Sequence, residues 1–297
     1  MDASTHKPSE RSAEFLLLIV VFIWALNAPL AKYGLGGLDI FVFNSIRYVV
    51  AFILLVAIFR SRNTWTYVPR QDWFKLIGLG VVANVVYQLL YIFGLKLTTA
   101  GNSAVLLSTS PLWTAFFNAK IHKDKILPQQ WTGMVLSLIG IVMIIIGSGK
   151  KLEFGSDAVY GDLLSLAGAM MWGLFTNLLK PLLIRYSAMQ VSVIAVGVGA
   201  VGLTMAAIPS VFTPGWSSVD TVFYVVPFIS GAFSIAVANV LWANGVKIIG
   251  PSRAANYNNL IPVIAFVAAY LTLHEQVFLI QVFGAAITIA GVWIARR

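Results

Sequence analysis

The chain contains no cysteine among its 297 residues, and only 10% of its residues are charged. The absence of cysteine excludes a disulfide framework and any metal site built on thiolates. A soluble domain carries about 25% charged and about 45–50% apolar residues, whereas hydrophobic types make up 59% of this chain. These proportions exclude an ordinary soluble protein, a disordered chain and a coiled coil, and they favour a chain that lies in a lipid bilayer.

The apolar residues form about ten runs of membrane-spanning length, since a spanning helix needs roughly 17–25 residues. A β-barrel would instead show short alternating segments. Lys7 and Arg11 precede the first run, as in a signal peptide, but the run is longer than a typical h-region and no A-x-A site follows it. The runs cover residues 15–32, 40–59, 74–95, 102–120, 129–147, 160–179, 189–208, 221–243, 254–273 and 277–295. We therefore predict an all-α integral membrane protein with ten transmembrane helices.

The distribution of Lys and Arg predicts the orientation. With the N-terminus in the cytoplasm, cytoplasmic segments hold 15 of the 20 basic residues, the opposite side holds four, and Arg47 lies inside a run. Positive residues concentrate on the cytoplasmic side of membrane proteins, so both termini are expected to be cytoplasmic. The same placement accounts for the net charge of +9 without a nucleic-acid partner, because no basic helix with interleaved aromatics lies outside the runs.

The two halves of the chain resemble each other. A shift of 151 residues aligns five first-half residues (Gly94, Lys96, Pro111, Gly133, Gly140) with five in the second half (Gly245, Lys247, Pro262, Gly284, Gly291). A shift of 148 aligns Trp24 and Lys32 with Trp172 and Lys180. Residues 13–147 and 158–297 are thus predicted to be two repeats of five helices. An odd number of helices per repeat inverts the second repeat in the membrane, an architecture of alternating-access carriers with a central cavity.

These features resemble paired EamA domains of the drug/metabolite transporter superfamily. Each repeat opens with a tryptophan-led helix (Trp24–Asn27, Trp172–Gly173) and ends with a proline-kinked helix and a glycine-rich one. The resemblance covers about residues 13–297 and implies metabolite transport. It is weaker for substrate, since the superfamily moves amino acids, nucleotide sugars, phosphorylated sugars and drugs. The chain is most similar to bacterial exporters of aromatic amino acids.

Polar groups inside the hydrocarbon are costly unless they face protein or a water-filled cavity, so they indicate where a cavity lies. Asn84, Tyr87, Gln88 and Tyr91 recur at helical spacing and share one face. Gln88 and Tyr91 have Asn239 and Trp242 as repeat partners; hydrogen bonding between helices is the alternative explanation. The candidate cavity residues are Asn27, Arg47, Asn84, Tyr87, Gln88, Tyr91, Trp172, Thr176, Asn239, Trp242, Tyr257 and Asn259.

Three of the singled-out residues have two interpretations. Arg47, the only charged residue well inside a run, suits a substrate carboxylate bound by a bidentate pair or a structural cap on a neighbouring helix. Pro111 and Pro262 fall near the middle of their runs, where a proline kinks a helix. Each kink is either a hinge or a static bend.

Acidic residues and histidines are missing from the middle of every run. Proton-driven carriers usually use an intramembrane Asp, Glu or His, and hydrolytic enzymes and metal sites need the same groups. We therefore expect no metal, no cofactor and no enzymatic activity. The predicted function is export of small metabolites, amino acids with aromatic ones included, by uncoupled alternating access across the inner membrane, and we expect a monomer. Alternatives are a multidrug or nucleotide-sugar carrier, a membrane enzyme or a channel.

Overall fold

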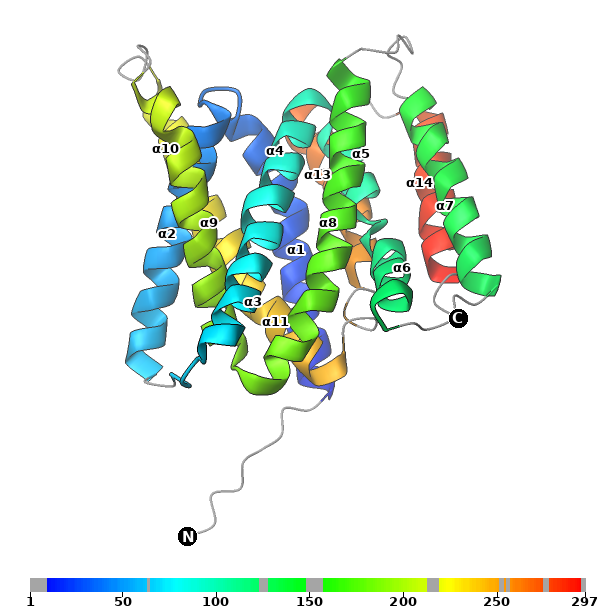
Figure 1. Ribbon diagram of the computed structural model, residues 1–297. Helices are drawn as coiled ribbons and strands as arrows, with labels where there is room; N and C mark the ends of the chain where they lie inside the picture. The colour runs from blue at the N-terminus through cyan, green and yellow to red at the C-terminus, as the bar shows by residue number, and fades with distance from the viewer. Residues whose placement is uncertain are drawn as a thin grey trace.

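The computed structural model describes residues 10–62, 65–122, 128–147, 157–212, 219–250, 254, 257–274 and 278–294, and all regular structure within these residues is helical. The helices form one bundle, with the start of α1 and the end of α14 on the same side (Figure 1). The first half contains α1 (Glu10–Gly34), α2 (Ile40–Arg62), α3 (Arg70–Gly80), η1 (Val81–Val86), α4 (Tyr87–Leu97), α5 (Ala100–Leu107), α6 (Ser110–His122) and α7 (Pro128–Gly147). The second contains α8 (Asp157–Arg185), α9 (Ala188–Val211), α10 (Thr221–Ser230), η3 (Gly231–Val237), α11 (Ala238–Ile249), η4 (Asn258–Leu260), α13 (Ile261–Leu273) and α14 (Leu279–Ile294).

Six helical segments are long and apolar enough to cross a membrane, judged by length and composition. Three of these segments belong to each half. Two of the six, Arg70–Leu97 and Thr221–Ile249, each consist of two α-helices joined by a π-helical segment. Many large apolar side chains on the outside of the bundle are exposed, such as Phe74, Ile184 and Phe283. An apolar exterior of this kind suits lipid rather than water. The six segments are Glu10–Gly34, Ile40–Ser61, Arg70–Leu97, Asp157–Arg185, Ala188–Val211 and Thr221–Ile249.

The expected helix at 102–120 is broken. Helix α5 ends at Leu107 and α6 begins at Ser110, one residue before Pro111. A proline ring clashes with the carbonyl four residues earlier and offers no N–H, which accounts for the end of α5 at Leu107. The Ser108 and Thr109 hydroxyls donate to the carbonyls of Val105 and Leu106. Pro111 thus begins a new helix instead of bending a continuous one.

Pro262 lies at the equivalent position. It is the second residue of α13, directly after the 3₁₀ turn η4. The first turn of a helix tolerates proline because its N–H groups have no partner within the helix. Both prolines therefore lie in the first turn of a helix that starts part-way along its apolar run.

Two π-helical segments occupy equivalent positions in the halves. Segment η1 (Val81–Val86) lies between α3 and α4, and η3 (Gly231–Val237) lies between α10 and α11. A π-helical turn inserts an extra residue and redirects the side chains that follow, often at functional sites. Asn84 in η1 and Ser234 in η3 both face the bundle interior, with exposed fractions of 5% each.

Element bounds and contacts recur between the halves under the shifts of 148 and 151. Helices α2 and α6 begin at Ile40 and Ser110, while α9 and α13 begin at Ala188 and Ile261. Helix α1 packs on α11 and α13, as α8 packs on α4 and α6. Helices α2 and α9 pack on each other, as do α7 and α14. The similarity of the halves extends from the sequence to the packing.

Helices α7 and α14 lie side by side at one edge of the bundle (Figure 1). Glycines allow their backbones to meet. A methyl group added at Gly140 would lie 2.5 Å from the carbonyl oxygen of Gly284, and one added at Gly291 would lie 2.6 Å from that of Gly133. Small residues at such contacts are a common basis of helix packing in membranes.

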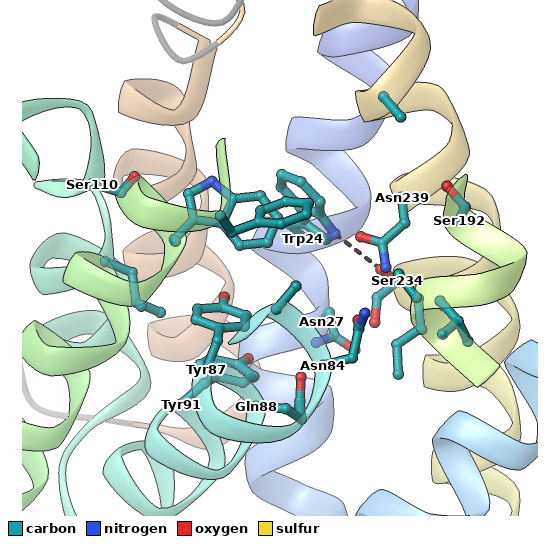
Figure 2. Close-up of a pocket in the computed structure, with 18 of the residues that line it drawn as sticks. Trp24, Asn27, Asn84, Tyr87, Gln88, Tyr91, Ser110, Ser192, Ser234 and Asn239 are labelled. Carbon is teal, nitrogen blue, oxygen red and sulfur yellow. Dashed lines mark hydrogen bonds between the residues drawn. The ribbon is translucent and has the colours of Figure 1, made fainter. Parts of the chain in front are cut away.

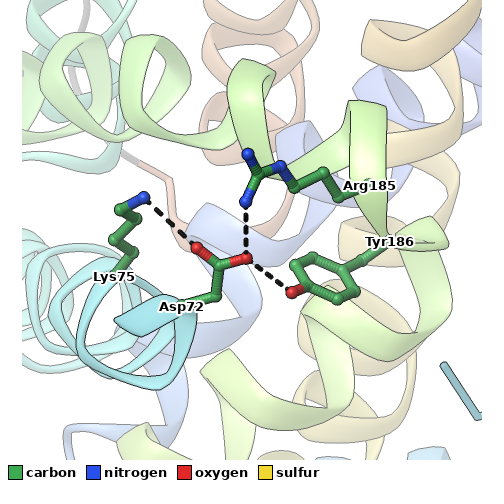
Figure 3. A network of polar contacts seen from close by, with 4 residues as sticks. All are labelled: Asp72, Lys75, Arg185 and Tyr186. Atoms are coloured by element: carbon green, nitrogen blue, oxygen red, sulfur yellow. Dashed lines mark hydrogen bonds and ion pairs between the residues drawn. The ribbon is translucent and has the colours of Figure 1, made fainter. Parts of the chain in front are cut away.

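A polar cluster joins the start of α3 to the turn between α8 and α9 (Figure 3). The Asp72 carboxylate accepts from Arg185 at 3.0 Å, from Tyr186 at 2.7 Å and from Lys75 at 3.2 Å. Because the Tyr186 hydroxyl donates its hydrogen bond to this carboxylate, the pKa of Tyr186 is raised above its ordinary value. The two halves of the chain are thus tied together at this end of the bundle.

Candidate functional site

A cavity of about 120 Å³ lies within the bundle, between the two halves. A single water needs roughly 10–15 Å³ of such space, so the cavity is sized for a small molecule. Figure 2 shows polar and aromatic side chains directed into it from both halves. Its described lining comes mainly from the middle of α1, α2 and α8, the first half of α4, α9 and α11, both π-helical segments and the broken region around Ser108 and Ser110.

Eight of the twelve predicted cavity residues line this cavity: Asn27, Arg47, Asn84, Tyr87, Gln88, Tyr91, Trp172 and Asn239. Thr176, Trp242 and Tyr257 are not among the lining residues that the structure describes. Thr176 is buried, and its hydroxyl donates to the Trp172 carbonyl. Trp242 packs behind the lining with 1% of its surface exposed, and Tyr257 packs against the same apolar core. The side chain of Asn259 lies outside the described residues.

Aromatic rings form the apolar wall of the cavity. Trp24 and Trp172, equivalent in the two repeats, meet edge to face with ring centroids 5.2 Å apart. Tyr87 lies 5.1 Å from Trp172 and stacks on Tyr91 at 6.0 Å. Trp242 supports both tryptophans from behind, at 5.3 and 5.8 Å. Such rings offer faces and edges to an aromatic or aliphatic ligand.

A network of hydrogen bonds forms the polar wall. The Tyr48 hydroxyl lies within hydrogen-bond distance of Asn84 Oδ1 (3.2 Å) and Gln88 Oε1 (3.3 Å). Gln88 donates in turn to Asn44 Oδ1 at 3.0 Å. The Trp24 indole donates to the Ser234 carbonyl at 3.0 Å, which links α1 to η3. These bonds hold the amide side chains in place before any ligand enters.

Arg47 joins this network from α2. Its guanidinium donates to Ser230 at 2.8 Å, to Asn44 at 3.1 Å and to Ser234 at 3.3 Å. The Ser230 hydroxyl donates in turn to Asn27 Oδ1 at 2.5 Å. Arg47 is 1% exposed, so its charge is held away from bulk water. The lining residues from the described part of the chain include no Asp, Glu or His, and no group there could hold a metal ion.

Several lining residues lie outside the predicted set, among them Trp24, Tyr48, Ser192, Ser234 and Asn258. Trp24 carried a usable signal, because it is the repeat partner of Trp172. Tyr48 directly follows Arg47 in the sequence, and it is not part of a set of polar residues at helical spacing that would have indicated it. Ser234 is brought inward within a π-helical segment, which a regular helical spacing does not anticipate.

The profile of the EamA-like transporter family matches residues 11–146 and again residues 159–297. The chain belongs to the EamA-like transporter family. The family and the helices long enough to span a membrane make it a multi-pass membrane transporter.

Proteins similar to this chain along nearly their whole length are described as transporters or exporters. An uncharacterized transporter of Archaeoglobus fulgidus is 28% identical, covering 99% of this chain and 98% of the relative. A protein of Streptantibioticus cattleyicolor named "Probable terminal-alkyne amino-acid exporter" is 25% identical, covering 96% and 93%. A solved crystal structure matches with a TM-score of 0.70 at 18% identity, covering 97% of this chain and 99% of that one, a likeness of fold alone.

Proposed function

We propose that this EamA-like protein exports small organic metabolites, amino acids with aromatic ones included, from the cytoplasm by alternating access. The observation that carries the proposal is the cavity between the halves, where an aromatic wall faces a wall of amides, hydroxyls and one arginine. A site with these two walls suits a molecule with an apolar body and a polar end. The exporter of Streptantibioticus cattleyicolor supports an amino-acid substrate.

The proposed architecture is ten transmembrane helices in two inverted repeats, 13–147 and 158–297, in the inner membrane with both termini in the cytoplasm. Each predicted apolar run overlaps with helix in the described residues, and the runs that contain Pro111 and Pro262 are interrupted near these prolines. The recurrence of element bounds under the two shifts, together with the uneven distribution of Lys and Arg, supports inversion. The cavity then lies where the repeats meet, as in other carriers of this design.

Counterflow in proteoliposomes tests the function. Vesicles loaded with unlabelled phenylalanine should take up external radiolabelled phenylalanine transiently, and uptake should saturate. A panel with leucine, a nucleotide sugar and a cationic dye separates the alternative carriers. Non-saturable flux would indicate a channel, and chemical turnover of the substrate would indicate an enzyme; either result refutes the proposal.

Transport is proposed to be uncoupled from protons and sodium. The cavity lining offers no Asp, Glu or His among the described residues, and Arg47 keeps its proton in water and in most protein sites. With equal substrate on both sides, an imposed pH or sodium gradient should drive no accumulation. Accumulation that disappears when the gradient is removed would refute the uncoupled mechanism while leaving carrier function intact.

A further inference from the structure

Arg47 carries the only formal charge among the described residues that line the cavity. The ion pairs that the structure describes both involve Asp72, at the end of the bundle, with Lys75 and Arg185 as its partners. The hydrogen-bond acceptors of Arg47 are hydroxyls and an amide, which are neutral. Within the described part of the chain, the Arg47 charge therefore has no counter-ion.

A charge buried inside a membrane protein is costly unless it is paired, and such residues mark ligand or ion pathways. Here the neutral oxygens of Asn44, Ser230 and Ser234 hold the guanidinium in a fixed orientation. A guanidinium has five N–H groups, of which three are used in these bonds. The others suit the two oxygens of a carboxylate, which is the usual bidentate partner of arginine.

The lining residues that the structure describes offer no negative charge for a positively charged ligand group. The amides of Asn27, Asn84, Gln88 and Asn239 and the hydroxyl of Tyr48 are neutral. A carboxylate at Arg47 would neutralise the site, whereas an ammonium would have to rely on amide oxygens and ring faces. The aromatic wall receives the apolar body next to this anchor.

We propose that the cavity recognises a carboxylate on an apolar or aromatic body through Arg47, and that it does not require an α-ammonium group. Amino acids are then one part of a wider class of monocarboxylate substrates. The inference rests on the proposed function for the location of the site, but it concerns which substrate group is recognised. The two can therefore fail separately.

Ligand binding to the purified protein in detergent tests this recognition directly. Bound ligand raises the unfolding temperature in proportion to its affinity and concentration. We expect 3-phenylpropionate and phenylalanine to stabilise the protein. Phenylalaninamide and phenethylamine lack the carboxylate, and their apparent Kd values should be at least about tenfold higher. Equal stabilisation by phenylalaninamide would overturn the inference, and so would a complete lack of stabilisation by both acids.

The two acids separate the inference from the proposed function. Binding of 3-phenylpropionate without binding or transport of phenylalanine supports carboxylate recognition and refutes amino-acid export. Transport of phenylalanine with no binding of 3-phenylpropionate supports amino-acid export and overturns the inference, because the ammonium would then be required.

Substitution of Arg47 provides the second arm. Arg47→Gln should weaken binding of 3-phenylpropionate by about 10- to 150-fold, the range for loss of hydrogen bonds to a charged group. Arg47→Lys keeps the positive charge but lacks the planar set of N–H donors, so this variant should bind 3-phenylpropionate with intermediate affinity. Arg60→Gln is the matched control, since Arg60 is exposed on the same helix. Unchanged affinity in a folded Arg47→Gln protein would overturn the inference, and the ligand comparison on the unaltered protein decides it if that variant does not fold.

Discussion

At the scale of single residues, the aromatic side chains of the cavity differ in how much they can be changed. Trp172 touches Trp24, Tyr87, Phe175 and Trp242 at centroid distances of 5.0–5.8 Å. Removing its ring would leave a hole in the core, and a Trp→Ala change of this kind costs about 3–5 kcal/mol of stability. Tyr87 is only half-buried, so its ring is the better probe of ligand binding.

Tyr87→Leu should weaken binding of aromatic substrates while leaving aliphatic ones nearly unchanged. A pair of aromatic rings is worth about 0.5–1.5 kcal/mol beyond area burial, which corresponds to a change of roughly 2- to 13-fold in affinity. Competition of phenylalanine and leucine against a labelled substrate measures the difference. Equal weakening of both substrates would mean that Tyr87 shapes the bundle and does not contact the ligand ring.

At the scale of helices, the sequence located the apolar runs well but not the interruptions within them. Proline at 111 and 262 predicted a bend in a continuous helix, whereas the structure starts a new helix one residue before each of them. Proline has no backbone N–H with which to continue the hydrogen bonds of a preceding helix. A glycine lies at the start of both π-helical segments, since Gly80 precedes η1 and Gly231 opens η3. With 24 glycines in the chain, this signal was too common to predict a π-helical turn. Arg47 meets Ser230 and Ser234, which are 183 and 187 residues away along the chain, so no local pattern could predict its partners.

The glycine contact between α7 and α14 should be sensitive to a single methyl group. Gly140→Ala would place a carbon against Gly284 and Thr288, and overpacking of this kind costs about 1–3 kcal/mol. Gly78→Ala is the matched control, because an added methyl there meets nothing within 4 Å. Thermal unfolding in detergent should show a lower midpoint for Gly140→Ala alone. Equal midpoints in the two variants would argue against a close glycine contact.

The Asp72 cluster should hold α3 against the turn that follows α8. Asp72→Asn keeps the shape but removes the charge that Arg185 and Lys75 contact, so the unfolding midpoint should fall and this end of the bundle should loosen. A single cysteine at Val191, which lines the cavity near the start of α9, should then react faster with an impermeant maleimide added from the cytoplasmic side. Lys75→Gln is the control, because Lys75 lies on α3 together with Asp72 and its ion pair does not connect the two halves. A reaction rate unchanged by Asp72→Asn would show that the cluster does not restrict access.

At the scale of the whole molecule, the proposed inversion of the second repeat predicts that equivalent residues of the two repeats lie on opposite sides of the membrane. Gly36 and Ile184 are related by the shift of 148, Arg70 and Thr221 by the shift of 151, and all four are exposed. Because the native chain has no cysteine, single cysteines at these positions report without background. Gly36 and Thr221 should be labelled from outside, and Arg70 and Ile184 from the cytoplasm. Labelling of equivalent positions from the same side would exclude inversion.

The guanidinium of Arg47 also places a charge within the electric field of the membrane. Moving one elementary charge across the full potential changes the free energy by about 2.3 kcal/mol per 100 mV. An empty site carries this charge when the carrier reorients, whereas a site that holds a monocarboxylate is neutral. Voltage should therefore alter net efflux of 3-phenylpropionate, which requires the empty carrier to return, but not its one-for-one exchange. The rates of exchange and of net efflux are measured at clamped potentials. If exchange depends on the potential as strongly as net efflux does, the bound carboxylate leaves the Arg47 charge uncompensated.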